Sequence, residues 1–227
     1  MKFSEKSFLK TVITSADGQP VPVETIFCVG RNYQKHIKEL NSKEPGEPII
    51  FTKPVTAICQ DRDIIPLPGK SNDIHHEVEL AIIIGKSGKE ISRKDAHEYI
   101  AGAAVALDLT MRDIQGQAKK NGTPWAIAKG FDSSCPISKV YPETGIDALS
   151  NIDLFLEKNN NMVQQGNTSD MIFKIDYLIS YLSGFFTLNP GDIILTGTPE
   201  GVGPIHNGDI LTFWSSFSEK VSIRFWR

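Results

Sequence analysis

Two glutamates inside an apolar stretch constrain this chain more than any other sequence feature. Residues 75–85 read His-His-Glu-Val-Glu-Leu-Ala-Ile-Ile-Ile-Gly, which predicts a β-strand that closes on a glycine. Side chains alternate between the two faces of a strand, so Glu77 and Glu79 point to the same face. Because Ala81 and Ile83 continue that face with apolar side chains, we expect the strand to be buried on both faces.

Neighbouring carboxylates near a core repel each other and lose their hydration, so they stay ionised only beside a compensating cation. Mg²⁺ or Mn²⁺ is the simplest candidate, because these ions prefer carboxylate oxygens. Asp108 is the discordant residue of a second apolar run, 103–109, and is the natural third ligand. The alternative is a strand end that reaches solvent, with hydrated glutamates.

Zinc is a poorer candidate for the metal. His75 and His76 are adjacent rather than spaced as in helical zinc proteases, and the three cysteines offer no paired ligands. We therefore expect both histidines to lie behind the metal ligands or on the surface.

Composition narrows the class of protein. The 227 residues carry a net charge of −3 with no basic run, which argues against a nucleic-acid partner. No apolar segment is long enough for a membrane span, and residues 1–6 lack the apolar core of a signal peptide. Cys28, Cys59 and Cys135 are scattered, as in a reducing compartment. We expect a cytoplasmic protein that does not contact membranes.

Short apolar runs bounded by glycine and proline predict many strands, few helices and no alternation of the two, which is typical of an α+β fold with a mostly β core. The lack of linkers and repeats favours a single domain, residues 1–227. Capping boxes predict helices that start near Ser92 and Thr110. Residues 125–130 read as extended. A helix after Asp170 should bury one apolar stripe: Ile175, Leu178, Ile179, Leu182 and Phe186.

His36 and Glu39 lie three residues apart in a helix-compatible segment, so they share a helix face. A carboxylate beside an imidazole orients the ring, as in a general base. The glycine before this segment and the Pro/Gly run after it suit a mobile lid. The alternative is a surface ion pair on a short helix, and the spacing taken alone favours that alternative.

Two further features have both a structural and a functional interpretation. Lys129 breaks an apolar pattern, either as a lysine that extends to solvent or as an anchor for an anionic substrate. The glycine-rich residues 197–203 form either a plain turn or a loop that brings backbone N–H groups and the Thr198 hydroxyl to a carboxylate. The loop lacks the Gly-Lys-Ser/Thr ending of a phosphate-binding loop, which excludes a nucleotide site.

Several motifs together resemble the fumarylacetoacetate hydrolase family. They are His-Glu-Val-Glu-Leu at 76–80, Leu-Asp-Leu-Thr at 107–110, Pro-Trp-Ala-Ile-Ala-Lys at 124–129 and Leu-Thr-Gly-Thr-Pro at 195–199. Val-Gly-Arg-Asn-Tyr at 29–33 resembles the small single-domain branch, which includes acylpyruvate hydrolases and oxaloacetate-processing enzymes. The resemblance implies a mixed β-roll with a lid helix, usually a homodimer.

The resemblance also implies roles for individual residues. It places Mg²⁺ or Mn²⁺ on Glu77, Glu79 and Asp108, and makes His36, Glu39 and Lys129 catalytic. The implied substrate-binding residues are Arg31, Arg112, Gln115, Lys129, Gly197 and Thr198. Val29 stands where larger members of the family carry a further aspartate ligand, so their specificity cannot be carried over to this chain.

The implied activity is metal-dependent cleavage of a C–C bond in acylpyruvate-type 2,4-dioxo acids, through an enolate whose charge the metal stabilises. Oxaloacetate decarboxylation and keto–enol isomerisation of a 2-oxo acid are the alternatives at the same site, because both pass through the same enolate. A non-catalytic dicarboxylate binder would not need the His36–Glu39 pair. A cysteine hydrolase using Cys28 is disfavoured, because that thiol lies in an apolar strand.

Overall fold

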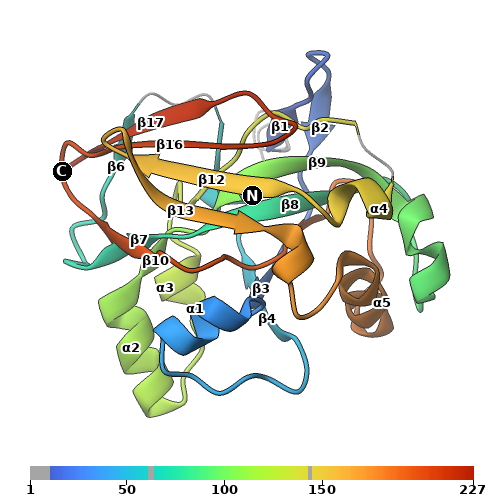
Figure 1. Ribbon diagram of the computed structural model, residues 1–227, viewed down its shortest axis with the longest axis horizontal. Coiled ribbons are helices and arrows are strands. Elements are labelled where there is room, and N and C mark those ends of the chain that lie inside the picture. The colour runs from blue at the N-terminus through green and yellow to red at the C-terminus, as the bar shows by residue number, and fades with distance from the viewer. Residues whose placement is uncertain (1–10, 61–63, 143–144) are drawn as a thin grey trace, which may run out of the picture.

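The computed structural model describes residues 11–60, 64–142 and 145–227. The N-terminal segment on which the signal-peptide prediction rests lies outside these residues. Two five-stranded sheets dominate the fold, and short helices flank them (Figure 1). This mixed, mostly β architecture confirms the α+β prediction.

The first sheet is mixed, and four of its five strands are largely buried and apolar. Its order is β4 (Ile49–Lys53), β3 (Ile26–Gly30), β14 (Ile193–Leu195), β8 (Val78–Ile84) and β9 (Ile100–Leu107). Strands β14 and β3 pair in parallel, and the other neighbours are antiparallel. Every residue of β8 is buried, as its continuous apolar run predicts for a strand covered on both faces.

The second sheet covers one face of the first. Its order is β13 (Asn161–Asn167), β12 (Asp153–Lys158), β16 (Ile210–Ser215), β17 (Val221–Trp226) and β6 (Ile64–Pro66). Alternating burial along β16 shows that one face packs inward, where Phe213 is fully buried. Strand β6 is an edge strand, in agreement with its proline.

Three smaller sheets and the helices complete the described chain. One sheet has the strand order β10 (Thr110–Met111), β7 (Ile74–His76) and β15 (Gly203–Ile205). A second pairs β11 (Cys135–Pro136) with β5 (Ile58–Cys59), and a third pairs β1 (Val12–Thr14) with β2 (Pro20–Pro22). The α-helices are α1 (Gln34–Glu39), α2 (Arg112–Asn121), α3 (Ala126–Lys129), α4 (Ile146–Leu149) and α5 (Ile175–Phe185). The 3₁₀ helices are η2 (Val55–Ala57), η3 (Arg93–Tyr99) and η4 (Thr168–Asp170).

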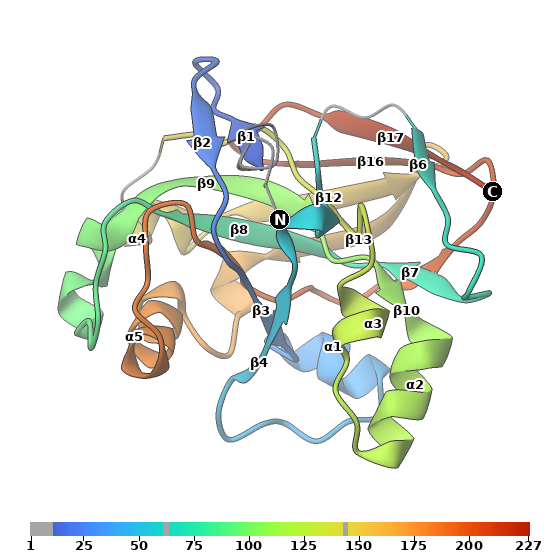
Figure 2. The ribbon, with the colours of Figure 1, turned by 180° about the vertical axis from the view of Figure 1, so that it is seen from behind.

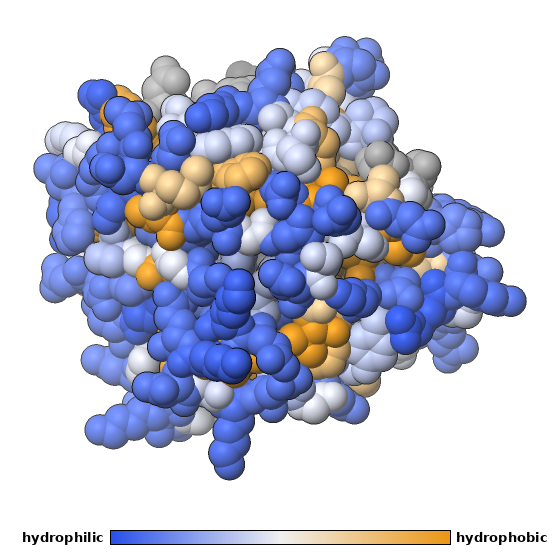
Figure 3. Space-filling view, in the orientation of Figure 1, coloured by the Kyte–Doolittle hydropathy of each residue, from blue (hydrophilic) through white to orange (hydrophobic). Residues whose placement is uncertain are grey.

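Helices α1, α2 and α3 gather below the sheets, and the view from behind shows the same grouping (Figure 2). No helix among the described residues is long and apolar enough to cross a membrane. On the face seen in Figure 3, hydrophilic side chains predominate and hydrophobic ones form small separate patches.

The structure corrects several local predictions. The strand predicted over 75–84 is interrupted at Glu77, where the chain passes from β7 in one sheet to β8 in another. Helices do begin near Ser92 and Thr110, as η3 and α2, but neither predicted capping box forms: the Ser92 hydroxyl bonds to the Asp95 carboxylate, and Thr110 lies in β10. Residues 126–129, predicted as extended, form α3, because two alanines favour a helical turn. Phe186 lies beyond α5 and is 44% exposed.

The buried first sheet should carry much of the stability. Ile82→Ala in β8 should lower the free energy of unfolding by about 2–5 kcal/mol, because the side chain is fully buried and leaves a cavity. Ile127→Ala in α3 is the control: that side chain is 72% exposed, and its loss should change stability by no more than about 0.5 kcal/mol. Urea denaturation of both variants tests this, and equal losses would contradict it.

Candidate active site

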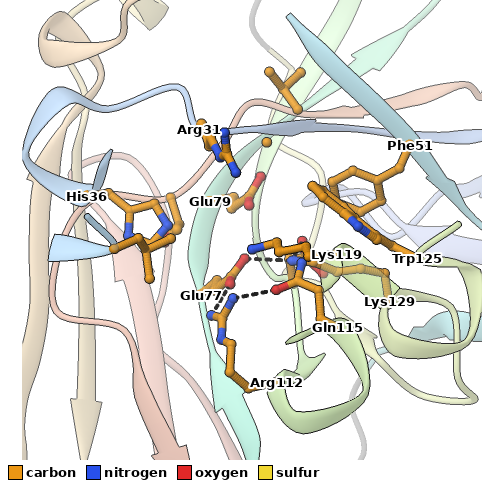
Figure 4. Close-up of a pocket in the computed structure, with 15 residues that line it drawn as sticks. Arg31, His36, Phe51, Glu77, Glu79, Arg112, Gln115, Lys119, Trp125 and Lys129 are labelled. Carbon is orange, nitrogen blue, oxygen red and sulfur yellow. Dashed lines mark hydrogen bonds and ion pairs between the residues drawn. The ribbon is translucent and has the colours of Figure 1, made fainter. Parts of the chain in front are cut away.

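Strand ends and helices α1, α2 and α3 meet at one pocket. Most of the residues singled out in the sequence line it, and Figure 4 shows their side chains converging. The predicted site residues that line it are Arg31, His36, Glu77, Glu79, Asp108, Arg112, Gln115, Lys129 and Thr198. Glu39 and Gly197 are not part of the lining, but they hydrogen-bond to His36 and Glu79, respectively.

Three buried carboxylates form one side of the pocket. Glu77 lies at the break between β7 and β8, Glu79 lies in β8, and Asp108 follows β9. The Asp108 backbone N–H donates to the Glu77 carbonyl oxygen at 2.8 Å, which ties the two strand ends together. One ligand oxygen from each carboxylate lies within 4.8 Å of the others. The alternative of hydrated glutamates at an exposed strand end is therefore excluded.

Cationic side chains surround these carboxylates. Lys129 Nζ donates to Glu77 Oε2 at 2.8 Å and to Asp108 Oδ2 at 2.6 Å. Arg112 donates to the other Glu77 oxygen and, at 2.9 Å, to Gln115 Oε1. Lys129 is thus a buried ion-pair partner, not a lysine that extends to solvent.

The carboxylates are compensated unequally. Burial by itself would raise the pKa of Glu77, but Lys129 and Arg112 hold it well below its usual value. The pKa of Glu79 is raised well above its usual value by burial and by the charges of Asp108 and Glu77. The cluster therefore retains an electrostatic demand for positive charge near Glu79.

A hard divalent cation fits this demand and this donor set. Carboxylate oxygens are the ligands that Mg²⁺ and Mn²⁺ prefer, and three of them converge from rigid strand ends. Glu77, Glu79 and Asp108 would hold the ion. Val29, which stands in the place of a further aspartate, lines the same pocket without offering a ligand.

Lys53 is a site residue that the sequence analysis missed. Its ammonium is completely buried at the end of β4, 2.8 Å from Asp108 Oδ1 but without the alignment of a hydrogen bond. It donates to the Lys129 carbonyl oxygen and to the Ser134 carbonyl and hydroxyl oxygens. One buried lysine thus fixes both Asp108 and the backbone of Lys129. The sequence feature that could have revealed Lys53 is a charged residue directly after the strand-like run 49–52.

The glycine-rich loop positions Glu79 and Thr198. Gly197 N–H donates to Glu79 Oε2 at 2.7 Å, as the predicted contact between this loop and a carboxylate requires. Gly197 has φ +97°, and a Cβ there would lie 2.7 Å from the Asn32 Cβ, so only glycine fits. Buried Gln164 donates to Thr198 Oγ1 at 3.0 Å. Gln164 lies in β13 and carried no sequence signal.

His36 and Glu39 form a contact in α1. His36 Nδ1 lies 3.0 Å from Glu39 Oε2, and the His36 side chain is only 6% exposed. The other Glu39 oxygen accepts from Gly201 N–H at 3.0 Å, which ties α1 to the glycine-rich loop. The pair is therefore not a purely surface feature: one side faces the pocket, and Glu39 orients the ring.

Three other titratable residues considered in the sequence analysis, His75, His76 and Cys28, do not line the pocket. His76 Nδ1 contacts Gln164 Oε1 at 3.0 Å, and burial lowers its pKa to about 4, so it is a neutral residue behind the ligands. His75 contacts Asp73 at 2.8 Å. Cys28 is fully buried, and burial raises its thiol pKa well above its usual value, which argues against a cysteine nucleophile.

Comparison with known proteins now adds to this geometry. The family model described as fumarylacetoacetate (FAA) hydrolase C-terminal matches residues 25–220. The chain belongs to this family.

Three relatives illustrate the similarity. Oxaloacetate tautomerase YcgM of Escherichia coli K12 is 50% identical over 192 residues, which cover 84% of this chain and 88% of that protein. The mitochondrial oxaloacetate decarboxylase of Dictyostelium discoideum is 46% identical, with 82% and 86% covered. Fumarylpyruvate hydrolase from Pseudomonas aeruginosa, in complex with Mn²⁺ and pyruvate, has a TM-score of 0.91 at 34% identity, with 96% of both chains covered.

The carboxylate cluster makes a prediction that does not depend on turnover. Glu79→Gln should lower Mn²⁺ affinity by more than about 100-fold, beyond the loss usual for a residue that only supports a ligand. The metal-free variant should be no less stable than the wild type, because the change removes a carboxyl group whose ionisation is opposed by burial and by the charges of Asp108 and Glu77. Equilibrium dialysis and thermal unfolding measure the two effects.

The matched control is Glu98→Gln, which alters an exposed glutamate paired with Lys86. It should leave Mn²⁺ affinity unchanged. Retention of wild-type affinity by Glu79→Gln would remove this residue from the set of proposed ligands.

Proposed function

We propose that this protein is a Mg²⁺- or Mn²⁺-dependent enzyme that forms and uses the enolate of a small 2-oxo acid, with keto–enol tautomerisation of oxaloacetate as its first candidate reaction. The observation that carries the proposal is the buried cluster of Glu77, Glu79 and Asp108, which faces Lys129, Arg112 and His36 across one pocket. The oxaloacetate tautomerases and decarboxylase among its relatives support it.

The pocket residues divide the work of tautomerisation. The metal, when bound, supplies positive charge that stabilises the developing enolate. Lys129 and Arg112 orient the anionic substrate. His36 takes a proton from the substrate's C3 carbon, and its imidazolium or a water molecule then delivers a proton to the C2 oxygen, which completes the enol. Because Nδ1 contacts Glu39, the Nε2 atom is the one available to the substrate. Glu39 stabilises the imidazolium that forms.

Hydrolysis of acylpyruvates is the second candidate. It is favoured by the same His36–Glu39 pair and by the likeness to fumarylpyruvate hydrolase. His36 would take a proton from water as that water attacks the distal carbonyl carbon. The C–C bond then breaks, and the products are a carboxylic acid and the enolate of pyruvate. Decarboxylation reaches the same enolate by loss of CO₂ and needs no water.

We propose one catalytic domain over residues 1–227 that assembles as a homodimer in the cytoplasm. Cys28, Cys59 and Cys135 are all buried, and scattered buried cysteines are typical of a reducing compartment. Sedimentation of the purified protein tests the dimer, and the bacterial relative supports the cytoplasmic assignment more than the mitochondrial relatives do.

The deciding experiment compares reactions on one preparation. The purified protein is loaded with Mg²⁺ or Mn²⁺ and assayed with oxaloacetate for tautomerisation and decarboxylation, and with acetylpyruvate and fumarylpyruvate for hydrolysis. The highest kcat/KM identifies the main reaction. Absence of all three activities in the metal-loaded protein would refute the proposal.

His36 provides a prediction that separates these reactions. His36→Ala should lower tautomerisation and hydrolysis by about 10²–10⁴-fold, because both need a positioned proton carrier. Decarboxylation should fall much less, since it needs mainly the stabilised enolate. Glu39→Gln should act in the same direction more mildly. His97→Ala, at an exposed histidine of η3, is the control and should change none of them.

Metal content should be unchanged in the His36 and Glu39 variants, because neither residue is a proposed ligand. Equal loss of all three reactions with metal retained would show that His36 acts in substrate binding or lid closure instead. The proton-transfer role would then be withdrawn.

A further inference from the structure

We propose that Arg31 and Lys119 form a second anion subsite in this pocket, which binds the distal carboxylate of a dicarboxylic 2-oxo acid. The inference rests on the proposed function and names the substrate class of the same site. The two residues reach the pocket from different elements: Arg31 follows β3, and Lys119 lies in the last turn of α2. Figure 4 shows both side chains pointing into the pocket.

Arg31 has a strained backbone and, within the described part of the chain, an unpaired side-chain donor, and a ligand could offset the second of these costs. Its backbone has φ 60°, in the left-handed region that disfavours residues other than glycine. The neighbouring Asn32 fixes this turn through hydrogen bonds to Thr196 and Phe173. Among the described residues, the buried Nε–H of Arg31 has no acceptor. An unpaired buried donor costs free energy, and a carboxylate that pairs with the guanidinium group of Arg31 would offset this cost.

Charge also favours a dianionic ligand. Four cationic side chains line the pocket against three carboxylates. Lys129 and Arg112 already bind those carboxylates. No ion pair involves Arg31 or Lys119 within the described ranges. A divalent ion on the carboxylates would raise the excess to three positive charges. A monocarboxylate neutralises one of these charges, and a dicarboxylate neutralises two.

The surroundings and the pKa of Lys119 also support an anion subsite. Its ammonium lies 5.2 Å from the centroid of the Trp125 ring. Burial and the positive charges of Arg112, Arg31 and Lys129 lower the pKa of Lys119 to about 8, against a smaller opposing effect of Glu77. A bound carboxylate would reverse this shift. The subsite should therefore bind anions while Lys119 is protonated, and lose affinity as the pH rises through about 8.

Two matched probes isolate the distal carboxylate. 2-Oxoglutarate and 2-oxopentanoate share the 2-oxo acid end and chain length, and differ by a terminal carboxylate against a methyl group. Titration calorimetry with the Mn²⁺-loaded protein should show tighter binding of 2-oxoglutarate. Lys119→Met should weaken 2-oxoglutarate binding by about 10- to 100-fold, as for loss of a charged hydrogen bond. It should change 2-oxopentanoate binding by less than about 2-fold, because that probe lacks the distal charge.

Two further variants and the pH dependence complete the test. Lys119→Arg should restore most of the preference, and Lys120→Met, at an exposed neighbour outside the pocket lining, should leave both affinities unchanged. In the wild type, the ratio of 2-oxoglutarate affinity to 2-oxopentanoate affinity should fall as the pH rises through about 8. In Lys119→Met this ratio should be low and should not change with pH. The affinities for both probes are measured without turnover. An inactive protein that still binds 2-oxoglutarate more tightly than 2-oxopentanoate would therefore refute the proposed function but not the subsite.

Equal weakening of both probes in Lys119→Met would overturn the subsite, because Lys119 would then only attract anions in general. An unchanged preference in that variant would overturn it as well.

Discussion

The fold must hold three carboxylates together in a buried space where they repel one another. Glu77, Glu79 and Asp108 come from strand ends, and a backbone hydrogen bond between Asp108 and Glu77 prevents the strands from separating. Lys129 bridges Glu77 and Asp108, and the Lys53 ammonium lies beside the other carboxylate oxygen of Asp108. Breaking a buried arrangement of this kind is costly, because each partner removed leaves an uncompensated charge. The rest of the site is arranged around this constraint.

The same constraint explains why nearby segments are irregular. The chain breaks at Glu77 so that β7 and β8 can join different sheets while both glutamates face one pocket. Gly197 adopts a positive φ where its N–H reaches Glu79, and Arg31 adopts one at the pocket rim. The positive φ of Arg31 carries a steric cost because this residue has a side chain, and such strain is often found where a ligand has to be positioned.

The sequence predicted the parts of this site that appear as charges within apolar runs. A charged residue in a buried strand loses its hydration and therefore needs a partner of opposite charge. This reasoning identified Glu77, Glu79, Asp108 and Lys129. Most strands followed from apolar runs bounded by glycine and proline. The helix over 126–129 did not, since four residues carry too little periodicity to distinguish it from an extended segment.

Residues that depend on tertiary packing could not be predicted. Gln164 connects His76, the β8 backbone and Thr198 from a strand far away in sequence, and nothing in its own neighbourhood marks it. Lys119 could not be assigned to the site from its own neighbourhood, because it lines one pocket with Arg31 only in the folded chain. The charge balance of the pocket is likewise a property of the assembled fold.

The central claim is that the carboxylate cluster is a metal centre on which the chemistry depends. It is tested most directly by titrating Mn²⁺ into the metal-free protein and following oxaloacetate tautomerisation on the same samples. Activity should rise in proportion to bound metal and saturate at one ion per chain. Full activity in the metal-free protein, or saturation of metal binding without any gain in activity, would contradict it.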